Sequence, residues 1–369
     1  MGVACGRFYR LSYGKDSSLT GHRMKIYTII GTRPQFVKAS AFSKTISMDS
    51  DVEEVSIHTG QHYDPAMSDI FFDELSMPLP KYNLNIGGQS HGAMTGNMLI
   101  ALEKIFLEEK PDCILVYGDT NSTLAGALAA SKLHIPLAHI EAGLRSYNKT
   151  MPEEQNRIIT DHLSDYLFCP TFESVNNLKK EAIMNGVHVG DIMYDVTCHL
   201  ENRINANLEF LSQLGLERNN YYVCTMHRAE NTDNKEQLGS LIAYLKTLSH
   251  EKKVVLPLHP RLAKACENFQ FSLDGLTVIN PLGYIDMMTL VKNSTRVYTD
   301  SGGLQKEAYF QAVECVTLRG ETEWTETISH GWNRLWTNAE YQRPRKDILD
   351  YGDGQSATKI LNFLKESLA

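Results

Sequence analysis

Three acidic side chains in the first half of the chain stand where they could transfer protons. Asp119 follows the apolar run at 113–117, Glu141 follows the run at 136–140, and Glu153 comes a little further on. Carboxylates that lie near one another push their pKa values apart, so that one site can hold both an acid and a base. The spacing therefore predicts general acid–base chemistry.

Helix capping is an alternative role for two of these acids. Asp119 could cap a helix that starts near Asn121, because an Asp oxygen there can accept a backbone N–H. Thr150 and Glu153 have the spacing of a capping box, with Pro152 in the first turn. The residues alone leave both alternatives open.

Histidines follow two strands that we expect in the second half. His227, with Arg228 next to it, comes after the run at 221–226, and His259 comes after the run at 253–258. A histidine titrates near neutral pH and can act as a general acid or base. For His227, a structural, hydrogen-bonded side chain is an equal alternative.

A basic corner follows the first expected strand. Gly31 lets the backbone turn tightly, and Arg33 and Lys38 lie beside the helix that should begin there. Such a corner can bind an anion. A plain strand-to-helix turn with solvated basic side chains is the alternative.

The strongest local pattern is the segment Ser301-Gly302-Gly303, which follows the run at 296–299 and opens a helix. The first backbone N–H groups of such a helix are available to a phosphate. Glu307, about one helical turn further on, is placed to accept hydrogen bonds from a ribose diol. A generic glycine-rich cap is the alternative.

The elements that position these residues are short β-branched or apolar runs that alternate with helical patterns. This alternation predicts an α/β fold with parallel sheets. The expected strands are 25–30, 52–59, 113–117 and 136–140 in a first group and 221–226, 253–258, 276–279, 296–299 and 314–318 in a second. We therefore expect two doubly wound sheets, with ligands beyond the carboxyl ends of their strands.

The same pattern sets the domain boundaries. We expect residues 1–23 to be an extension or tag, 24–195 an N-terminal domain, and 196–351 a C-terminal domain. A last helix within about 352–369 carries an apolar face and is expected to cross back onto the N-terminal domain.

Composition excludes several classes of function. The 369 residues include 36 Lys and Arg against 44 Asp and Glu, for a net charge of −8. This balance argues against a surface that binds nucleic acid or anionic lipid. No apolar stretch approaches the roughly 18 residues of a membrane span, and the first 23 residues lack the apolar core of a signal peptide.

The cysteines stand singly and favour a reducing compartment. The seven are Cys5, Cys113, Cys169, Cys198, Cys224, Cys266 and Cys315. Their spacing excludes a zinc ribbon or a disulfide framework, and no His, Asp and Glu cluster has convincing metal-ligand spacing. We therefore expect a cytoplasmic protein with neither a metal nor another cofactor.

Seven segments form a specific set: GTRPQFVK, HTGQH, YGDTNST, HIEAGLRS, MPEEQNR, TMHRAEN and TDSGGLQKEA. In this order and spacing they resemble the non-hydrolysing UDP-N-acetylglucosamine 2-epimerases, and the likeness runs from about Met24 to Trp336. The resemblance implies the glycosyltransferase-B architecture, with two Rossmann-like domains around a deep cleft. It also implies that the C-terminal domain binds UDP and that the chain forms a homodimer.

The resemblance implies a mechanism as well. A base removes the proton at C2 of a UDP-linked 2-acetamido sugar while UDP leaves C1, which gives a 2-acetamidoglucal. UDP is then added back, and C2 is protonated on its opposite face. No nicotinamide is required. The product would serve bacterial surface polysaccharide synthesis.

Residue by residue, the resemblance implies four catalytic groups: Asp119, Glu141, Glu153 and His227. It implies that Arg33 and Lys38 bind the anion and that Ser301, Gly302, Gly303 and Glu307 contact the diphosphate and ribose. We also expect substrate contacts from Arg145, Arg228, His259, Tyr284 and Arg319.

Departures from the family pattern bear on the sugar. Many members have Glu where Gln35 stands and Arg where Trp324 stands. The exchange of Arg for Trp removes a cation and adds a flat ring. Both features resemble the branch that acts on UDP-2,3-diacetamido-2,3-dideoxy-glucuronate. Glu314 falls where a Gly-Lys-Pro turn is common, and the sequence offers no reason for it.

Three other functions stay open. A glycosyltransferase of the same architecture would need one principal base, and the three acids of the first half argue against it. A hydrolysing epimerase, which releases UDP and free sugar, differs in whether water enters the cleft. A non-enzymatic sensor of nucleotide sugars would be expected to lack an acid or His227, and all four are present.

Overall fold

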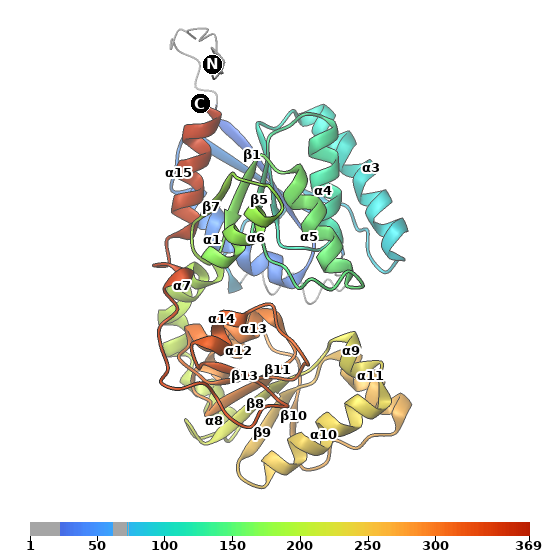
Figure 1. Ribbon diagram of the computed structural model, residues 1–369, viewed down its shortest axis with the longest axis vertical. Coiled ribbons are helices and arrows are strands. Elements are labelled where there is room, and N and C mark those ends of the chain that lie inside the picture. The colour runs from blue at the N-terminus through green and yellow to red at the C-terminus, as the bar shows by residue number, and fades with distance from the viewer. Residues whose placement is uncertain (1–22, 62–71, 73) are drawn as a thin grey trace, which may run out of the picture.

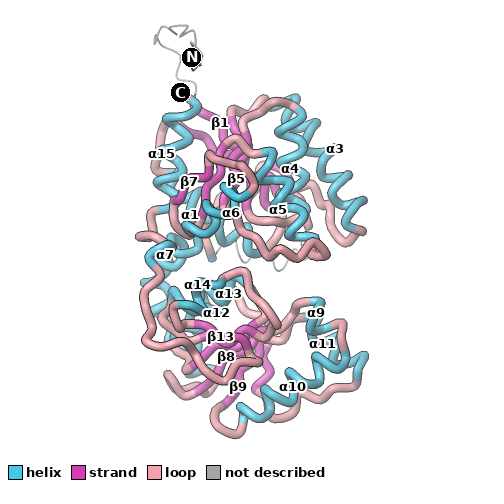
Figure 2. The backbone as a smooth tube through the Cα atoms, viewed as in Figure 1, coloured by secondary structure: helices cyan, strands magenta, loops and turns pink. Residues whose placement is uncertain are grey.

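The computed structural model describes residues 23–61, 72 and 74–369, and these form two lobes joined along one side (Figure 1). Except for residue 23, the predicted extension lies outside the described residues. In each lobe a parallel sheet is covered by helices (Figure 2). The predicted α/β class, with two Rossmann-like domains, is confirmed.

The first lobe contains a sheet that has seven strands among the described residues. The strands are β1 (Met24–Ile30), β2 (Val52–His58), β3 (Tyr82–Asn83), β4 (Cys113–Tyr117), β5 (Leu137–Ile140), β6 (Tyr166–Cys169) and β7 (Gly186–His188). Their order is β3-β2-β1-β4-β5-β6-β7, and each neighbouring pair is parallel. Parallel pairing places all the carboxyl ends at one edge.

Helices cover both faces of this sheet. They are α1 (Arg33–Ser47), α3 (His91–Glu109), α4 (Asn121–Lys132), α5 (Pro152–Leu163) and α6 (Phe172–Lys180). The buried side chains of α3 and α4 pack on one face, and those of α1 pack on the other. Because both faces are covered, β4 is buried along its whole length.

The second lobe repeats this plan with six strands among the described residues. The strands are β8 (Tyr221–Thr225), β9 (Lys253–Pro257), β10 (Thr277–Ile279), β11 (Arg296–Thr299), β12 (Cys315–Thr317) and β13 (Asn333–Leu335), in the order β10-β9-β8-β11-β12-β13. The helices are α8 (Leu208–Gln213), α9 (Ala229–Thr232), α10 (Lys235–Ser249), α11 (Pro260–Phe269), α12 (Tyr284–Lys292), α13 (Gly302–Phe310), α14 (Thr325–Ser329) and the 3-10 turn η1 (Leu349–Tyr351).

The lobes share helix α7 (Ile192–Ala206), which runs through the predicted boundary at residue 195. Its buried Ile192, Val196, Leu200 and Ile204 recur every four residues and so form one apolar face. The helix packs against α1 of the first lobe and against α12 and α13 of the second. The predicted position of the boundary stays a prediction, because a single helix belongs to both cores.

The last helix, α15 (Ser356–Leu368), returns to the first lobe, where it packs against α1 (Figure 1). Asp195 of α7 fixes its start, since its two carboxylate oxygens accept the backbone N–H groups of Ser356 at 3.0 Å and Ala357 at 2.7 Å. The ring of Phe363 then contacts Phe168 of β6, with 5.6 Å between centroids.

Glu314, which the sequence left without a reason, neutralises a group of arginines beside β12. Its carboxylate lies 2.8 Å from Arg296, 2.6 Å from Arg343 and 3.0 Å from Arg345. Burial opposes ionisation, but these arginines lower the pKa of Glu314. These three ion pairs give a structural reason for an acidic residue at position 314.

We predict that the contact of α15 with the first lobe is a main source of that lobe's stability. Leu364→Ala removes a fully buried side chain and should lower the free energy of unfolding by about 3 kcal/mol. Asn362→Ala, an exposed position on the same helix, is the matched control. Equal urea midpoints for the two variants would contradict this prediction.

Candidate active site

The site is built where the carboxyl ends of the two sheets meet. In the first lobe, the segments after β1, β4 and β5 carry Arg33, Asp119 and Glu141, respectively. In the second lobe, the segments after β8 and β11 carry His227 and Ser301, respectively. Parallel topology collects these five positions at facing edges, as the strand pattern predicts.

Glu141 is the most constrained acid of the site. Its backbone has φ 72°, in the left-handed region that a residue with a side chain seldom adopts. One carboxylate oxygen pairs with the ammonium of Lys38, and the other lies 3.0 Å from Nζ of Lys306. Although burial opposes ionisation, the two ammonium groups lower the pKa of Glu141 to about 2.

Lys306 brings the second lobe into this cluster. It lies on α13, is 1% exposed, and pairs with Asp191 as well as with Glu141. Its Nζ stands 3.8 Å from the centre of the Trp324 ring. The sequence pattern assigns no role to Lys306, although its place in the helix that follows Ser301-Gly302-Gly303 is a signal that could have found it.

Gly118 and His139 shape the backbone beneath the acids. Gly118 has φ 62°, and a Cβ there would lie 3.2 Å from the carboxylate of Glu141. The carbonyl of Gly118 accepts a hydrogen bond from Nε2 of the fully buried His139 at 2.7 Å, and Nδ1 of that ring pairs with Asp161 at 2.7 Å. His139 therefore fixes the turn that carries Asp119.

Asp119 and Glu153 come from neighbouring elements. Asp119 pairs with the buried Arg157 of α5. Glu153 lies four residues before Arg157 and so on the same side of that helix. The capping alternatives are wrong, because Thr120 caps α4 and the N-terminus of α5, at Met151, has no side-chain cap.

Gln35 links the loop after β1 to the loop after β4 through hydrogen bonds. Its Oε1 accepts the backbone N–H of Gly31 at 2.9 Å. Its Nε2 donates to the carbonyl of Tyr117 at 2.8 Å and to the hydroxyls of Thr120 and Thr123, both at 3.0 Å. Since Gln35 is 1% exposed, it acts on the site through the backbone.

In the second lobe, Asp300 holds the loop that presents His227. Its buried carboxylate accepts the backbone N–H groups of His227 and Arg228, both at 2.9 Å, and the amide of Asn231 at 3.0 Å. The ring of His227 lies 5.1 Å from that of His259, measured between centroids. Burial lowers the pKa of His227, against the opposing effect of Asp300, and Arg228 adds to the lowering.

One charged side chain of the first lobe lies close to polar side chains of the second: Arg33 is near Glu307 and Tyr284. Arg33 donates to the backbone carbonyl of Leu282 at 3.1 Å. Burial lowers the pKa of Arg33, and the negative charge of Glu307 opposes that shift. Burial also disfavours the charged forms of Glu307 and Tyr284, and for these acidic groups it therefore raises the pKa. The predicted anion contact and the predicted ribose contact are therefore neighbours.

The segment Ser301-Gly302-Gly303 opens α13 as expected. The hydroxyl of Ser301 accepts the backbone N–H of Leu304 at 3.5 Å. A Cβ on Gly302 would lie 2.5 Å from the carboxylate of Glu323 and 3.2 Å from the indole nitrogen of Trp324. A glycine is therefore needed where the loop at 319–326 crosses the start of the helix.

The other expected contacts are engaged within the protein. Arg145 is buried and pairs with Asp161 and Glu181, each at 2.7 Å. Arg319 is also buried and pairs with Glu230 and Glu323, while Arg228 lies 3.7 Å from Glu323. His259 caps α11 by accepting the backbone N–H of Arg261 at 3.1 Å. Arg145 and Arg319 nevertheless line one pocket between the lobes.

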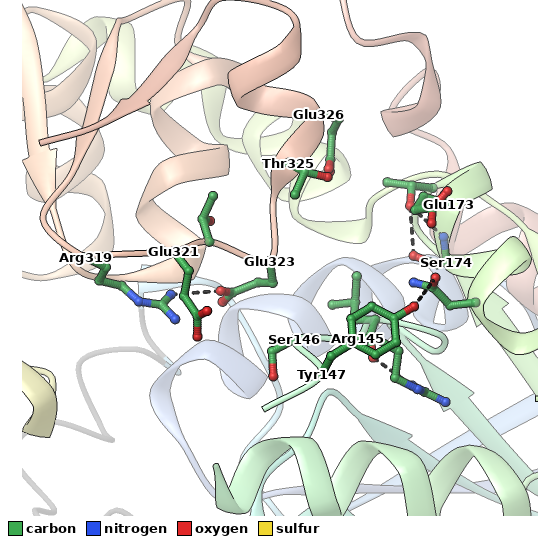
Figure 3. A pocket seen from close by; sticks show the side chains of 14 residues that line it. Arg145, Ser146, Tyr147, Glu173, Ser174, Arg319, Glu321, Glu323, Thr325 and Glu326 are labelled. Carbon is green, nitrogen blue, oxygen red and sulfur yellow. Dashed lines mark hydrogen bonds and ion pairs between the residues drawn. The ribbon is translucent and has the colours of Figure 1, made fainter. Parts of the chain in front are cut away.

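A pocket of about 230 Å³ lies between residues 144–147 of the first lobe and residues 319–326 of the second, which include the start of α14. Figure 3 shows Tyr147 on one side of it and Arg319, paired with Glu323, on the other. Side chains of both lobes thus line one cavity, as a cleft between two domains requires.

The described residues hold neither a metal-binding cluster nor a membrane-spanning helix. They contain no group of three or more His, Cys, Asp or Glu side chains arranged to hold a metal ion. Among the helices of that same part of the chain, none has the length and apolar character needed to cross a membrane.

Comparisons with known proteins agree on one family. Its profile, described as UDP-N-acetylglucosamine 2-epimerase, matches residues 44–365. A UDP-N-acetylglucosamine 2-epimerase homolog of Methanococcus maripaludis is 48% identical, over 93% of this chain and 99% of that protein. The UDP-2,3-diacetamido-2,3-dideoxy-D-glucuronate 2-epimerase of Pseudomonas aeruginosa is also 48% identical, over 92% of this chain and 99% of that protein.

A solved structure resembles the whole fold. The Methanocaldococcus jannaschii UDP-GlcNAc 2-epimerase, in complex with UDP-GlcNAc and UDP, superposes with a TM-score of 0.86 at 40% identity. The match covers 93% of this chain and 100% of that one. The predicted glycosyltransferase-B-like architecture is confirmed.

We predict that His227 titrates below its ordinary pKa of about 6.5, because burial disfavours the charged ring. Asp300→Asn should lower the pKa of His227 further, since the Asp300 carboxylate favours the imidazolium. The test is an NMR titration assigned with His227→Gln, and Asp274→Asn on an exposed loop is the control. A His227 midpoint at or above 6.5 would contradict the prediction.

Proposed function

Because this chain belongs to the UDP-N-acetylglucosamine 2-epimerase family, we propose that it inverts C2 of a UDP-linked 2-acetamido sugar and leaves the product attached to UDP. The observation that carries this proposal is the carboxylate of Glu141. It is buried at the junction of the lobes and held by a lysine from each. The two lysines keep this carboxylate ionised, so it is available to accept a proton, and other acids lie nearby.

In the proposed reaction a base takes the C2 proton, the C1–O bond breaks, and UDP departs as a 2-acetamidoglucal forms. Re-addition of UDP to C1 and protonation of C2 from the other face complete the inversion. Two faces of one carbon require two proton-handling groups. Asp119, Glu141, Glu153 and His227 are the candidates from the two lobes.

The departing diphosphate needs fixed positive groups. Arg33 lies beside Leu282 of the second lobe. Helix α13 begins at Gly302, and its N-terminus offers backbone N–H groups to an anion, although that of Leu304 already bonds Ser301. Donors aimed at a leaving group stabilise the charge that develops on it. We assign the diphosphate to these groups, and the ribose to Glu307.

Two sugars are candidates within this proposal. Membership of the family supports UDP-GlcNAc as the substrate. UDP-2,3-diacetamido-2,3-dideoxy-glucuronate is favoured by the 48% identity to the Pseudomonas aeruginosa enzyme. It is also favoured by Trp324, whose ring faces the ammonium of Lys306. Each sugar carries the 2-acetamido group and UDP, so the same elimination serves both.

We further propose that the chain works in the cytoplasm, as a homodimer, in the synthesis of bacterial surface polysaccharide. The six cysteines in the described part of the chain are unpaired, and five of them are buried. Unpaired thiols fit a reducing compartment. Light scattering would test the dimer, for which a mass of twice 41.6 kDa is expected.

We predict that incubation in deuterated water without an acceptor incorporates deuterium at C2 of one or both candidate UDP-sugars. The product should be a mixture of gluco and manno forms still linked to UDP, because C2 is deprotonated and reprotonated within the bound complex. Proton NMR and mass spectrometry give the readout. Free sugar would point to the hydrolysing alternative, and unexchanged substrate in both reactions would overturn the proposal.

A second prediction concerns Glu141 itself. Glu141→Gln keeps the size of the side chain but removes its ability to take a proton. C2 exchange should therefore fall by at least about 10²-fold, while calorimetry shows UDP binding within a few fold of wild type. Glu103→Gln, at an exposed position on α3, is the control. If Glu141→Gln retained C2 exchange, Glu141 would be excluded from proton transfer.

A further inference from the structure

Lys306 joins three parts of the chain that are far apart in sequence. Its ammonium contacts Glu141, at the end of β5 in the first lobe, and Asp191, at the start of the shared helix α7. The side chain is 1% exposed. A lysine buried in this way keeps its charge when carboxylates compensate it, and here two of them do.

The carboxylate of Glu141 is held from two sides. Lys38, on α1 of the first lobe, takes one oxygen, and Lys306, on α13 of the second, takes the other. Neither oxygen is free to turn without breaking an ion pair. The orientation of Glu141 therefore depends on the second lobe as well as on its own.

Helix α13 connects this lysine to the proposed diphosphate site. The helix begins at Gly302, where N–H groups would receive the diphosphate, and Lys306 stands four residues later. Four residues make about one helical turn, so the anion site and the lysine move as one rigid element. A ligand that fixes the start of α13 also fixes the group that holds Glu141.

Lys306 itself is poorly suited to donate a proton. Burial lowers its pKa, but Asp191 and Glu141 outweigh burial, and the net effect raises the pKa above the ordinary value. The ring of Trp324, which is 3% exposed, lies 3.8 Å from Nζ and shields that side of the ammonium. Its geometry suits holding a carboxylate.

We propose that Lys306 is a positioning residue for Glu141, and that it couples binding of a diphosphate at the start of α13 to the placement of that carboxylate for proton transfer at C2. The inference rests on the proposed function, in which Glu141 handles the C2 proton. Lys306 does not contact the reacting carbon in this scheme, because its ammonium is occupied by Glu141 and Asp191.

The charged groups that face Glu141 or Lys306 are Lys38 of α1, Asp191 before α7, Glu307 on α13 itself and Glu326 of α14. Removing the Lys306 charge leaves Glu141 with Lys38 as its neighbouring cation. Because Lys38 belongs to the first lobe, the carboxylate then loses its tie to the second lobe, and the loss should appear in kcat and not in UDP binding.

The test compares Lys306→Met with wild type in the C2 exchange assay at neutral pH. We expect kcat to fall by about 10²-fold, as for a misplaced catalytic group. UDP affinity should stay within about threefold by calorimetry. Lys306→Arg should recover part of kcat. The control is Lys292→Met, which removes a lysine of α12 that pairs with Glu201.

Loss of Lys306 also leaves Asp191 without its ion-pair partner, and this could impair folding. The double variant Lys306→Met, Asp191→Asn removes one charge of each sign, so its melting temperature should return toward that of wild type. If the double variant keeps the low kcat while its UDP affinity stays within about threefold of wild type, the inference is supported. A folded variant with kcat restored would overturn it.

A failure of the proposed function can be distinguished from a failure of the role proposed for Lys306. Wild-type protein that exchanges no C2 hydrogen in either sugar overturns the epimerase proposal before any variant is compared. A wild type that exchanges normally, together with a Lys306→Met variant whose UDP affinity collapses while kcat is kept, overturns the positioning role alone.

Discussion

The structure depends most on one desolvated carboxylate, that of Glu141, which is 9% exposed and paired with Lys38 and Lys306. Removing a carboxylate from water costs several kcal/mol unless nearby charges and hydrogen bonds compensate it. Here the compensation comes from both lobes. The group that is best placed for chemistry is therefore also a link that holds the lobes together.

The surrounding backbone is arranged around that carboxylate. Glu141 takes a left-handed φ at the end of β5, and Gly118 at the end of β4 leaves the space that a Cβ would fill. His139 anchors Gly118 from inside the core. In the second lobe, the carboxylate of Asp300 holds the loop of His227 by accepting its backbone N–H. Local strain and buried polar contacts at strand ends are typical of sites that position reacting groups.

Much of this arrangement could be predicted from the sequence, because strand ends in parallel sheets are readable from apolar runs. All nine expected strands exist, and Asp119, Glu141, His227 and Ser301 follow strands as predicted. The strands β3, β7 and β13 were missed because their segments, Tyr-Asn, Gly-Val-His and Asn-Arg-Leu, form no apolar run. Strand β6 was missed although Tyr-Leu-Phe-Cys is such a run. Lys306 and Asp191 were missed as partners, because a contact across 115 positions leaves no local pattern. Gln35 was expected to bear on the sugar, and the structure engages it in a buried network. Arg145 pairs with a buried acid but also lines the pocket, so its substrate contact stays a prediction.

One measurement tests most directly whether C2 is inverted by loss of UDP with the help of Glu141. A UDP-sugar that the enzyme turns over is labelled with ¹⁸O in the bridge between C1 and the β-phosphorus. If the C1–O bond breaks, rotation of the bound phosphate moves the label to non-bridging positions, which ³¹P NMR detects. We predict scrambling in wild type at a rate comparable to epimerisation, and none in Glu141→Gln. Epimerisation with the label retained wholly in the bridge would contradict the elimination and the role given to the buried carboxylate.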